Sequence, residues 1–234
     1  MELELKKECL DTYELGEPQA LTQEETAETI VPDYCPDIAR IISAEGVVYL
    51  HGSAEQDSVT GTVRVTVLYT PENESGVRAL EFAMPFSAQG EGLTGCAHVA
   101  AETEIELLES RMLNPRKIFT RCKLVTHLTG CRKVCLTISS DAETDPALLV
   151  EKRCCGQTVS LLRQVAEKDL TFSETMSLSL GREGAAELLH CRANGIVTET
   201  KAIGNKLIFK GVFLVSVLYR TTGGQLASAS AELP

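Results

Sequence analysis

GTVRVTVLYT, residues 61–70, and GVFLVSVLYR, residues 211–220, both begin with glycine, continue through β-branched residues and reach Val-Leu-Tyr. Side chains alternate between the two faces of a strand, so residues two positions apart share a face. The alignment of the two stretches preserves this alternation, because Val63, Val65, Val67 and Tyr69 fall on Phe213, Val215, Val217 and Tyr219. The pattern predicts one strand that occurs twice, with the same face buried each time.

The correspondence continues on both sides of these strands, at offsets that drift slowly. Ile41 and Ile42 line up with Leu188 and Leu189, Ile30 with Met176, and Pro85 with Pro234; LELKKECL from Leu3 resembles LLVEKRCC from Leu148. Drifting offsets are what loop-length changes produce in an internal repeat. The repeat unit is therefore about 145–150 residues long.

This repeat predicts two units, residues 1–146 and residues 147–234, with the stretch DAETDPALL from Asp141 as the linker between them. The second unit ends at Pro234, before any equivalent of residues 86–146. A chain of 234 residues can bury a real core in this arrangement.

The chain is mainly strand-forming, and an antiparallel β-sandwich or barrel-like repeat is the expected fold class. Five runs have strand length and β-branched character, separated by turn-forming spacers: residues 45–52, 61–70, 77–86, 97–110 and 116–128. Residues 121–139 suggest two strands around a Thr129-Gly130 turn. Residues 36–42 and 182–190 have a helical pattern, which predicts one short helix in each unit.

The composition excludes several classes of function. The formal net charge of −11 repels phosphate backbones and anionic lipids, so nucleic acid and membrane surfaces are poor partners. The N-terminus has no continuous apolar region of the kind found in signal peptides, and no window has the roughly 20 apolar residues of a membrane helix. The nine cysteines are odd in number and irregularly spaced, which predicts buried, reduced thiols in a cytosolic protein.

No catalytic constellation emerges from the sequence. The four histidines lie in unrelated contexts, no G-x-S-x-G elbow is present, and GEGLTG lacks the Gly-Lys-Ser/Thr ending of a phosphate-binding loop. We therefore expect neither enzyme activity nor a cofactor.

One cluster could hold a metal ion. Cys122, His127, Cys131 and Cys135 fall within the predicted hairpin, and four such ligands could bind tetrahedral zinc. The spacing is not the paired C-x-x-C of zinc ribbons, so buried thiols and a surface histidine are the alternative interpretation. The vicinal pair Cys154-Cys155 lacks a C-x-x-C redox motif.

The segment VPDYCPDIARII, residues 31–42, is the most unusual in the chain. Its two Pro-Asp steps restrict the backbone and predict a rigid corner that seats Ile38, Ile41 and Ile42 in the core. The alternative interpretation is a partner-binding surface formed by Pro32, Asp33, Tyr34, Pro36 and Asp37. The second unit lacks both Pro-Asp steps, so this chemistry belongs to the first unit alone.

Four segments in this order, VPDYCPDIARII, VTVLYTPEN, LEFAMPFS and MLNPRKI, resemble the SPOCS domain family. That family occurs in spore-coat and spore-morphogenesis proteins of clostridia-type spore formers. The resemblance covers nearly all of residues 1–146 and, more weakly, residues 148–234. Similar members often carry tandem SPOCS units followed by a LysM domain, and in one of them the LysM-bearing end engages the ATPase that polymerises as the coat basement layer. No LysM-like segment lies within these 234 residues.

The resemblance implies a non-enzymatic scaffold in the mother-cell cytoplasm, at the forespore surface. Its expected partners are spore coat morphogenetic proteins, including the coat-basement ATPase, with no nucleic acid and no membrane insertion. A truncated second unit would leave an exposed sheet edge, through which the chain could also self-associate. A zinc- or thiol-based regulatory protein that uses the Cys122–Cys135 cluster is the alternative function.

Overall fold

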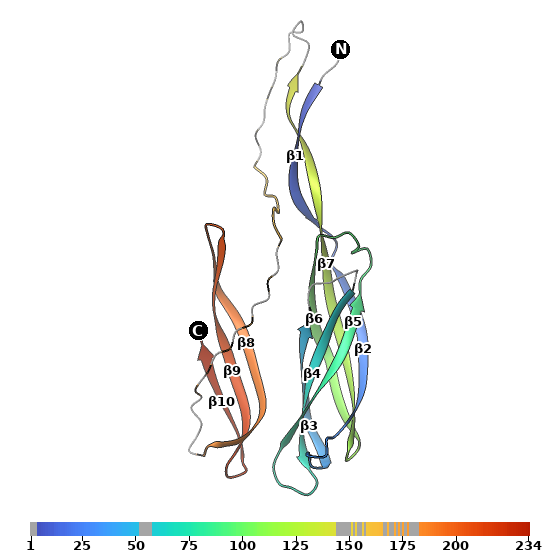
Figure 1. Cartoon of the computed structure of the whole chain (residues 1–234), viewed down its shortest axis with the longest axis vertical. Helices are drawn as coiled ribbons and strands as arrows, with labels where there is room; N and C mark the ends of the chain where they lie inside the picture. The colour runs from blue at the N-terminus through green and yellow to red at the C-terminus, as the bar shows by residue number, and fades with distance from the viewer. Residues whose placement is uncertain are drawn as a thin grey trace.

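The computed structural model describes residues 4–51, 58–143 and 183–234, together with residues 151, 153, 156, 158–165, 168, 171, 173, 175 and 177. Its regular structure consists of ten strands in three antiparallel sheets, none of which closes into a barrel (Figure 1). The prediction of a mainly β fold is confirmed. No helix occurs in the described residues, so the prediction of one short helix per unit is wrong.

The three sheets follow one another along the chain, except that sheet A takes strands from both ends of the first unit. Sheet A contains β1 (Glu4–Leu15), β2 (Gln19–Ile30), β6 (His98–Asn114) and β7 (Lys117–Glu143). Sheet B contains β3 (Ile38–Leu50), β4 (Ser58–Pro71) and β5 (Arg78–Gln89). Sheet C contains β8 (Ala185–Ile203), β9 (Lys206–Thr221) and β10 (Leu226–Leu233).

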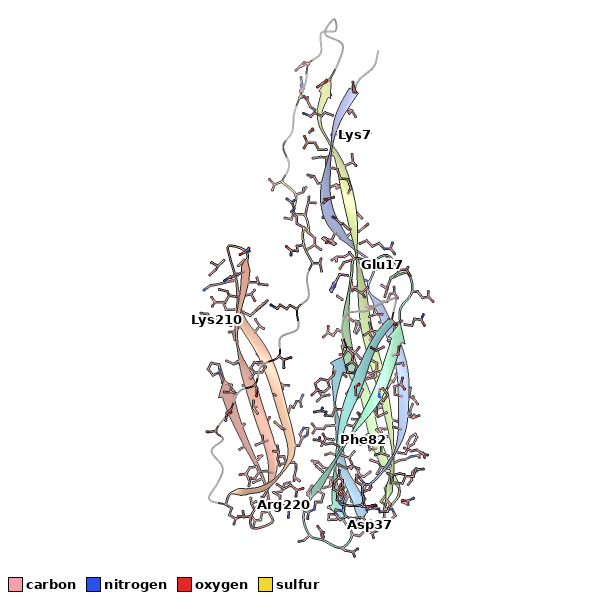
Figure 2. The ribbon with its side chains drawn as sticks, in the orientation of Figure 1. Lys7, Glu17, Asp37, Phe82, Lys210 and Arg220 are labelled. Atoms are coloured by element: carbon pink, nitrogen blue, oxygen red, sulfur yellow. A yellow bond between two sulfur atoms is a disulfide. The ribbon has the colours of Figure 1, made fainter. Side chains whose placement is uncertain are left out.

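β7 is the central strand of sheet A and, with 27 residues, the longest strand described. β2 and then β1 pair along one edge of β7, and β6 pairs along the other. Residues 4–30 thus run beside nearly all of β7, interrupted only at residues 16–18, where the Gly16 N–H still donates to the Gly130 carbonyl at 2.8 Å. Figure 2 shows Lys7 on the two-stranded ribbon that β1 and β7 form beyond sheet B.

Sheet B packs face to face against the part of sheet A formed by β2, β6 and β7. Alternate residues of β4 and β5 meet alternate residues of β7 in one apolar core, in which each buried side chain stabilises the fold by roughly 1.5–3 kcal/mol. The fully buried residues include Val63, Val65, Val67 and Tyr69 from β4 and Ile118, Cys122 and Leu124 from β7. A smaller cluster around Val59, Leu93, Val99 and Leu128 continues this core.

Sheet C has the same strand order and register as sheet B. Tyr69 pairs with Ile41 as Tyr219 pairs with Leu188, and Val67 pairs with Leu80 as Val217 pairs with Ala229. The first two bulges of β8, between Ala185 and Glu187 and between Leu188 and His190, lie at the positions of the two bulges in β3. The internal repeat inferred from the sequence therefore holds, residue by residue, across these six strands.

The bulges explain why two strands have a helical pattern in the sequence. Each bulge adds one residue to β3, so the residues that face the core are Ile38, Ile41 and Ala44, at intervals of three. The same spacing appears in β8 at Ala185, Leu188 and Cys191. An apolar residue at every third position is close to the helical period, which is why the sequence pattern predicts a helix there.

The predicted hairpin at residues 121–139 is also wrong, because these residues lie within the single strand β7. Gly130 is a strand residue at a close contact, since a Cβ there would lie 2.6 Å from Cys96 Sγ. The other predicted strands overlap β3, β4, β5, β6, β7 and β9. β1, β2 and β10 were not predicted, and β8 begins within a predicted helix.

The cysteines are not all reduced, in contrast to the prediction. A disulfide joins Cys9 of β1 to Cys135 of β7, whereas Cys35, Cys96, Cys122, Cys131 and Cys191 are free thiols. The disulfide connects residues 126 positions apart in the sequence, across the two-stranded ribbon. Residues 141–143 of the predicted linker belong to β7, and the rest of the linker, including Leu148, lies outside the described residues. Met176 and the Cys154-Cys155 pair also lie outside the described residues.

The glycines that begin the two repeated strand segments are required by close packing between strands. A Cβ at Gly61 would lie 2.7 Å from the Tyr49 carbonyl oxygen, and a Cβ at Gly211 would lie 2.2 Å from the Ile196 carbonyl oxygen. We expect Gly61→Ala and Gly211→Ala each to lower the free energy of unfolding by about 2–3 kcal/mol, because backbone atoms cannot rotate away. Urea denaturation measures the change.

Gly184→Ala is the matched control for these two variants, since a Cβ at Gly184 would meet no atom within 4 Å. We expect its free energy of unfolding to stay within about 0.5 kcal/mol of the parent value. Equal stability of all three variants would contradict the close approach.

Candidate interaction surfaces

The corner between β2 and β3 is held by the guanidinium of Arg116. Its Nη2 donates to the Val31 carbonyl and the Asp33 carboxylate, both at 2.9 Å. Its Nη1 donates to the Cys35 carbonyl at 2.8 Å and to the Asp37 carboxylate at 3.1 Å. The planar fork of arginine suits such a set of four oxygens. The two Pro-Asp steps and the Asn-Pro-Arg-Lys turn of the sequence thus meet in one structure.

Backbone contacts complete the corner. The N–H groups of Val31 and Ile38 donate to the carbonyls of Arg116 and Pro115, each at 2.9 Å. The Tyr69 hydroxyl donates to the Pro36 carbonyl at 3.3 Å from within the core.

These contacts support the interpretation of residues 31–42 as a rigid corner that seats Ile38 and Ile41 in the core, but Ile42 is 51% exposed, so its predicted place in the core is wrong. The carboxylates of Asp33 and Asp37 serve the corner through Arg116. Tyr34 differs from its neighbours, because its side chain is 87% exposed at the tip of the corner. Of the five residues predicted to bind a partner, Tyr34 is therefore the one that presents a large side chain to solvent.

Removal of the arginine tests the corner. Arg116→Ala leaves the carbonyls of Val31 and Cys35 without this donor and two carboxylates without their cation, so we expect the free energy of unfolding to fall by about 2–4 kcal/mol. Arg116→Lys keeps the charge but not the fork and should recover less than half of the loss. Arg40→Ala, at an exposed position of β3, is the control. A loss no larger than that of the control would contradict the role of Arg116.

Tyr69 gives the fold a specific dependence on alkaline pH. Burial, followed by its contact with Cys35, raises the pKa of Tyr69 from 10.0 to about 12. Between these values the unfolded chain loses the proton and the folded chain keeps it, so stability is complete below pH 10.0 and falls as pH rises to about 12. We expect the free energy of unfolding of Tyr69→Phe to fall less steeply over this range. Parallel pH profiles for the two proteins would contradict the assignment.

The four residues of the zinc hypothesis are not brought together. Cys122, His127, Cys131 and Cys135 all lie on β7, where a rise of about 3.3 Å per residue places the first and last about 40 Å apart. Cys122 and Cys131 are buried, His127 faces Glu104 on the exposed surface, and Cys135 is bonded to Cys9. Burial raises the pKa of the Cys122 thiol to about 11, which opposes thiolate formation. No group of three His, Cys, Asp or Glu suited to a metal ion occurs among the described residues.

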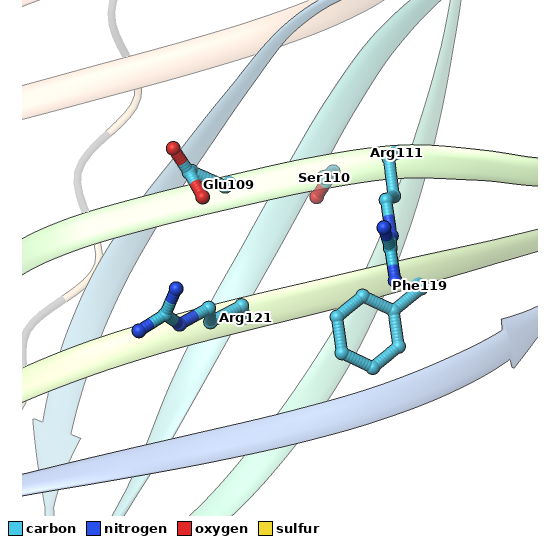
Figure 3. A pocket seen from close by; sticks show the side chains of 5 residues that line it. All are labelled: Glu109, Ser110, Arg111, Phe119 and Arg121. Atoms are coloured by element: carbon cyan, nitrogen blue, oxygen red, sulfur yellow. The ribbon is translucent and has the colours of Figure 1, made fainter.

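A shallow hollow on the outer face of β6 and β7 has a volume of about 500 Å³ and is lined by Glu109, Ser110, Arg111, Phe119 and Arg121 (Figure 3). Its polar groups already have partners within the protein. Arg121 pairs with Glu24 at 2.6 Å, the Arg111 guanidinium lies 4.9 Å from the centre of the Phe119 ring, and Ser110 hydrogen-bonds to Thr120. The hollow offers no arrangement of nucleophile and base.

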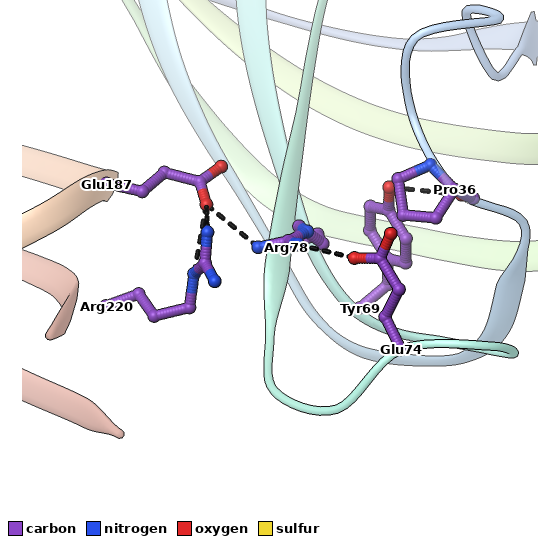
Figure 4. Close-up of polar contacts among 6 residues, drawn as sticks. All are labelled: Pro36, Tyr69, Glu74, Arg78, Glu187 and Arg220. Carbon is purple, nitrogen blue, oxygen red and sulfur yellow. Dashed lines mark hydrogen bonds and ion pairs between the residues drawn. The ribbon is translucent and has the colours of Figure 1, made fainter. Parts of the chain in front are cut away.

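Sheet C contacts sheet B through a small charged network at one end (Figure 4). The Glu187 carboxylate of β8 accepts hydrogen bonds from Arg78 of β5 at 3.0 Å and from Arg220 of β9 at 2.7 Å, and Arg78 also pairs with Glu74. His190 lies 3.2 Å from the Glu45 carboxylate of β3. The face of sheet C that carries Glu187, His190 and Arg220 is therefore turned towards sheet B.

The opposite face of sheet C is the surface that the sequence reasoning missed, and we call it the open face. By register it consists of alternate residues, including Phe209, Phe213, Val215, Val217 and Tyr219 of β9 and the paired positions of β8 and β10. None of these paired positions is charged, whereas Arg192, Glu199, Lys210 and Glu232 lie on the other face. The alternation of Ala and Ser in LASASAEL, residues 226–233, is the sequence signal that points to this face.

The open face corresponds to the face of sheet B that sheet A covers. Val59 and Val63 are 1% and 0% exposed, whereas their equivalents Phe209 and Phe213 are 59% and 37% exposed. Leu188 of β8 is 61% exposed. The open face is buried only towards one end of β9, where Val217 and Tyr219 are 7% and 3% exposed. A surface built as a core face is thus accessible to solvent over much of its length.

Comparisons with known proteins do not assign the chain to a family. Among its described residues, no helix is both long enough and apolar enough to cross a membrane. The chain matches no protein-family model, no curated protein and no solved structure.

Proposed function

We propose that this chain is a non-enzymatic assembly module in spore coat morphogenesis, built from SPOCS-like units, of which the first is an antiparallel β-sandwich. It would act in the mother-cell cytoplasm at the forespore surface, with coat morphogenetic proteins such as the coat-basement ATPase as partners. The segments that resemble the family support this proposal, because VPDYCPDIARII and MLNPRKI contribute the two sides of the Arg116 corner.

The open face of sheet C is the observation that carries the assembly role. Exposed, uncharged apolar surface of this extent is the usual mark of a protein–protein interface. Phe209 at 59% exposure supplies the kind of aromatic side chain that dominates binding energy at such surfaces. Tyr34, at the tip of the corner, offers a second contact of the same kind.

The polar clusters within the described residues also support a role in assembly rather than catalysis. The carboxylates of Asp33 and Asp37 are paired with Arg116, and that of Glu187 is paired with Arg78 and Arg220. A catalytic acid or base needs a geometry open to a substrate, whereas these groups hold loops and sheets together.

Localisation during sporulation tests the proposal. We expect immunofluorescence in a surrogate spore former that expresses the chain to show a shell around the forespore, and deletion of the coat-basement ATPase to abolish the shell. Phe209→Glu, on the open face, should weaken the shell because a carboxylate there opposes burial. Ile208→Glu, on the other face of the same strand, should leave it intact.

Diffuse signal that is equally strong in vegetative cells would contradict the assignment to the spore coat. A shell that both variants retain would keep the assignment and contradict the role of the open face.

A further inference from the structure

The two-stranded ribbon of β1 and β7 differs from the rest of sheet A in its packing. Beyond Cys131, β7 pairs with β1 alone among the described strands, because β6 reaches only to Cys131 and β2 only to Leu128. The ribbon lies beyond sheet B (Figure 1). Leu5, Leu136 and Ile138 are therefore 45%, 43% and 38% exposed. A two-stranded ribbon that exposes its apolar side chains is only marginally stable in water.

The Cys9–Cys135 disulfide closes this ribbon. It joins diagonal neighbours in the ladder of β1 and β7. At the end of β1 nearer to sheet B, the Gly16 N–H donates to the Gly130 carbonyl and anchors the strand. A cross-link restricts the chain in its open state and thereby opposes opening. The disulfide thus fixes the part of β1 that has the least other support.

Both cysteines of this disulfide are exposed to solvent, whereas Cys122 and Cys131 of the same β7 strand are buried free thiols. Exposed disulfides are typically the labile and regulatory ones, because a thiol can attack them without prior unfolding of the protein. The position of the Cys9–Cys135 bond therefore suits reversible reduction.

The ribbon also holds residues 158–165, which precede sheet C in the sequence and which we call the connecting segment. The Tyr13 N–H and the Thr12 hydroxyl both donate to the Leu162 carbonyl, at 2.9 Å and 3.0 Å. Leu161 and Leu162 line a hollow together with side chains of β1 and β7. The attachment of the connecting segment therefore depends on the order of β1.

We propose that the Cys9–Cys135 bond is a thiol–disulfide switch that sets the order of the ribbon and, through it, the attachment of the connecting segment. In the oxidised chain the ribbon is closed and Leu162 has both donors. In the reduced chain the ribbon opens and Leu162 loses them. The sandwich of the first unit stays folded in both states, because its core lies between sheet B and the other part of sheet A. This inference goes beyond the assembly role proposed above and does not depend on it.

A dithiol reductant balances the exchange. One thiolate of the reductant attacks a sulfur of the Cys9–Cys135 bond, which breaks as a mixed disulfide forms and the other cysteine leaves as a thiolate. The second thiol of the reductant then displaces the protein from the mixed disulfide. Two electrons and two protons thus pass from the dithiol to the two cysteines, and the reductant is left as a disulfide. A disulfide oxidant reverses each step.

Hydrogen exchange of the purified full-length chain, measured by mass spectrometry with and without dithiothreitol, tests the switch. We expect exchange in residues 4–15 and 131–143 to become at least about tenfold faster on reduction, because the ribbon then opens locally. Exchange in residues 61–70 and 117–128, within the sandwich, should stay unchanged. Reoxidation should restore the slow exchange of the ribbon.

Two serine variants separate this disulfide from the other thiols. Cys9→Ser should show the faster exchange of the ribbon with or without dithiothreitol, since it cannot form the bond. Cys191→Ser, the matched control, removes an exposed free thiol and should respond to dithiothreitol as the parent does.

Trypsin cleavage after Arg163 provides a second readout, because this exposed residue directly follows Leu162. We expect cleavage there to be several-fold faster in the reduced chain, in which the connecting segment is released. Cleavage after Lys206, at the start of β9, should proceed at the same rate in both states.

Equal exchange of the ribbon in the oxidised and reduced chains would overturn the switch, as would a purified, air-oxidised parent without the Cys9–Cys135 bond. Loss of protection throughout the sandwich on reduction would also overturn it, since the bond would then support the whole first unit. An opened ribbon with unchanged cleavage after Arg163 would overturn the link to the connecting segment.

Discussion

Hydrogen bonding along β7 is the interaction on which the first unit depends. This strand has partners on both edges, and its inward side chains form the floor on which sheet B packs. Arg116 directly precedes Lys117, the first residue of β7, so the register of this strand also aims the guanidinium at the corner. A one-residue shift of β7 would turn Ile118, Cys122 and Leu124 away from the core. The core and the corner therefore share a single structural determinant.

The alternation of side chains along strands made much of sheets B and C predictable from the sequence, and β-bulges limited how far this prediction reached. Along β4 and β9 the alternation is unbroken, so the pairing of the two repeats follows from the sequence alone. β3 and β8 contain bulges that convert a period of two into intervals of three, and no local property of Ile38–Ile42 separates that pattern from a helix. β1 and β2 escaped prediction because their many charged residues, such as Glu24 and Glu28, resemble a solvated segment until β7 is placed beside them.

The candidate sites were predictable only where the chemistry is local. The rigid corner follows from two Pro-Asp steps within six residues, but its clamp comes from Arg116, which lies 79 to 85 positions from the groups it binds. The zinc hypothesis depended on a turn at Thr129-Gly130, and a glycine placed for close packing is indistinguishable in sequence from a glycine placed for a turn. The open face became visible only through exposure, because its residues have the pattern of an ordinary buried strand face.

A ribosome releases β1 and β2 well before β7 exists. Residues 4–30 must wait for residues 117–143, a delay of roughly 6–20 s when about 5–20 residues are added per second. The three strands of sheet B are consecutive and can pair as local hairpins during that interval, whereas contacts so distant in sequence form slowly. The nascent first unit thus passes through a stage in which sheet B lacks its cover. At that stage the exposed face of sheet B resembles the open face of sheet C in the folded chain.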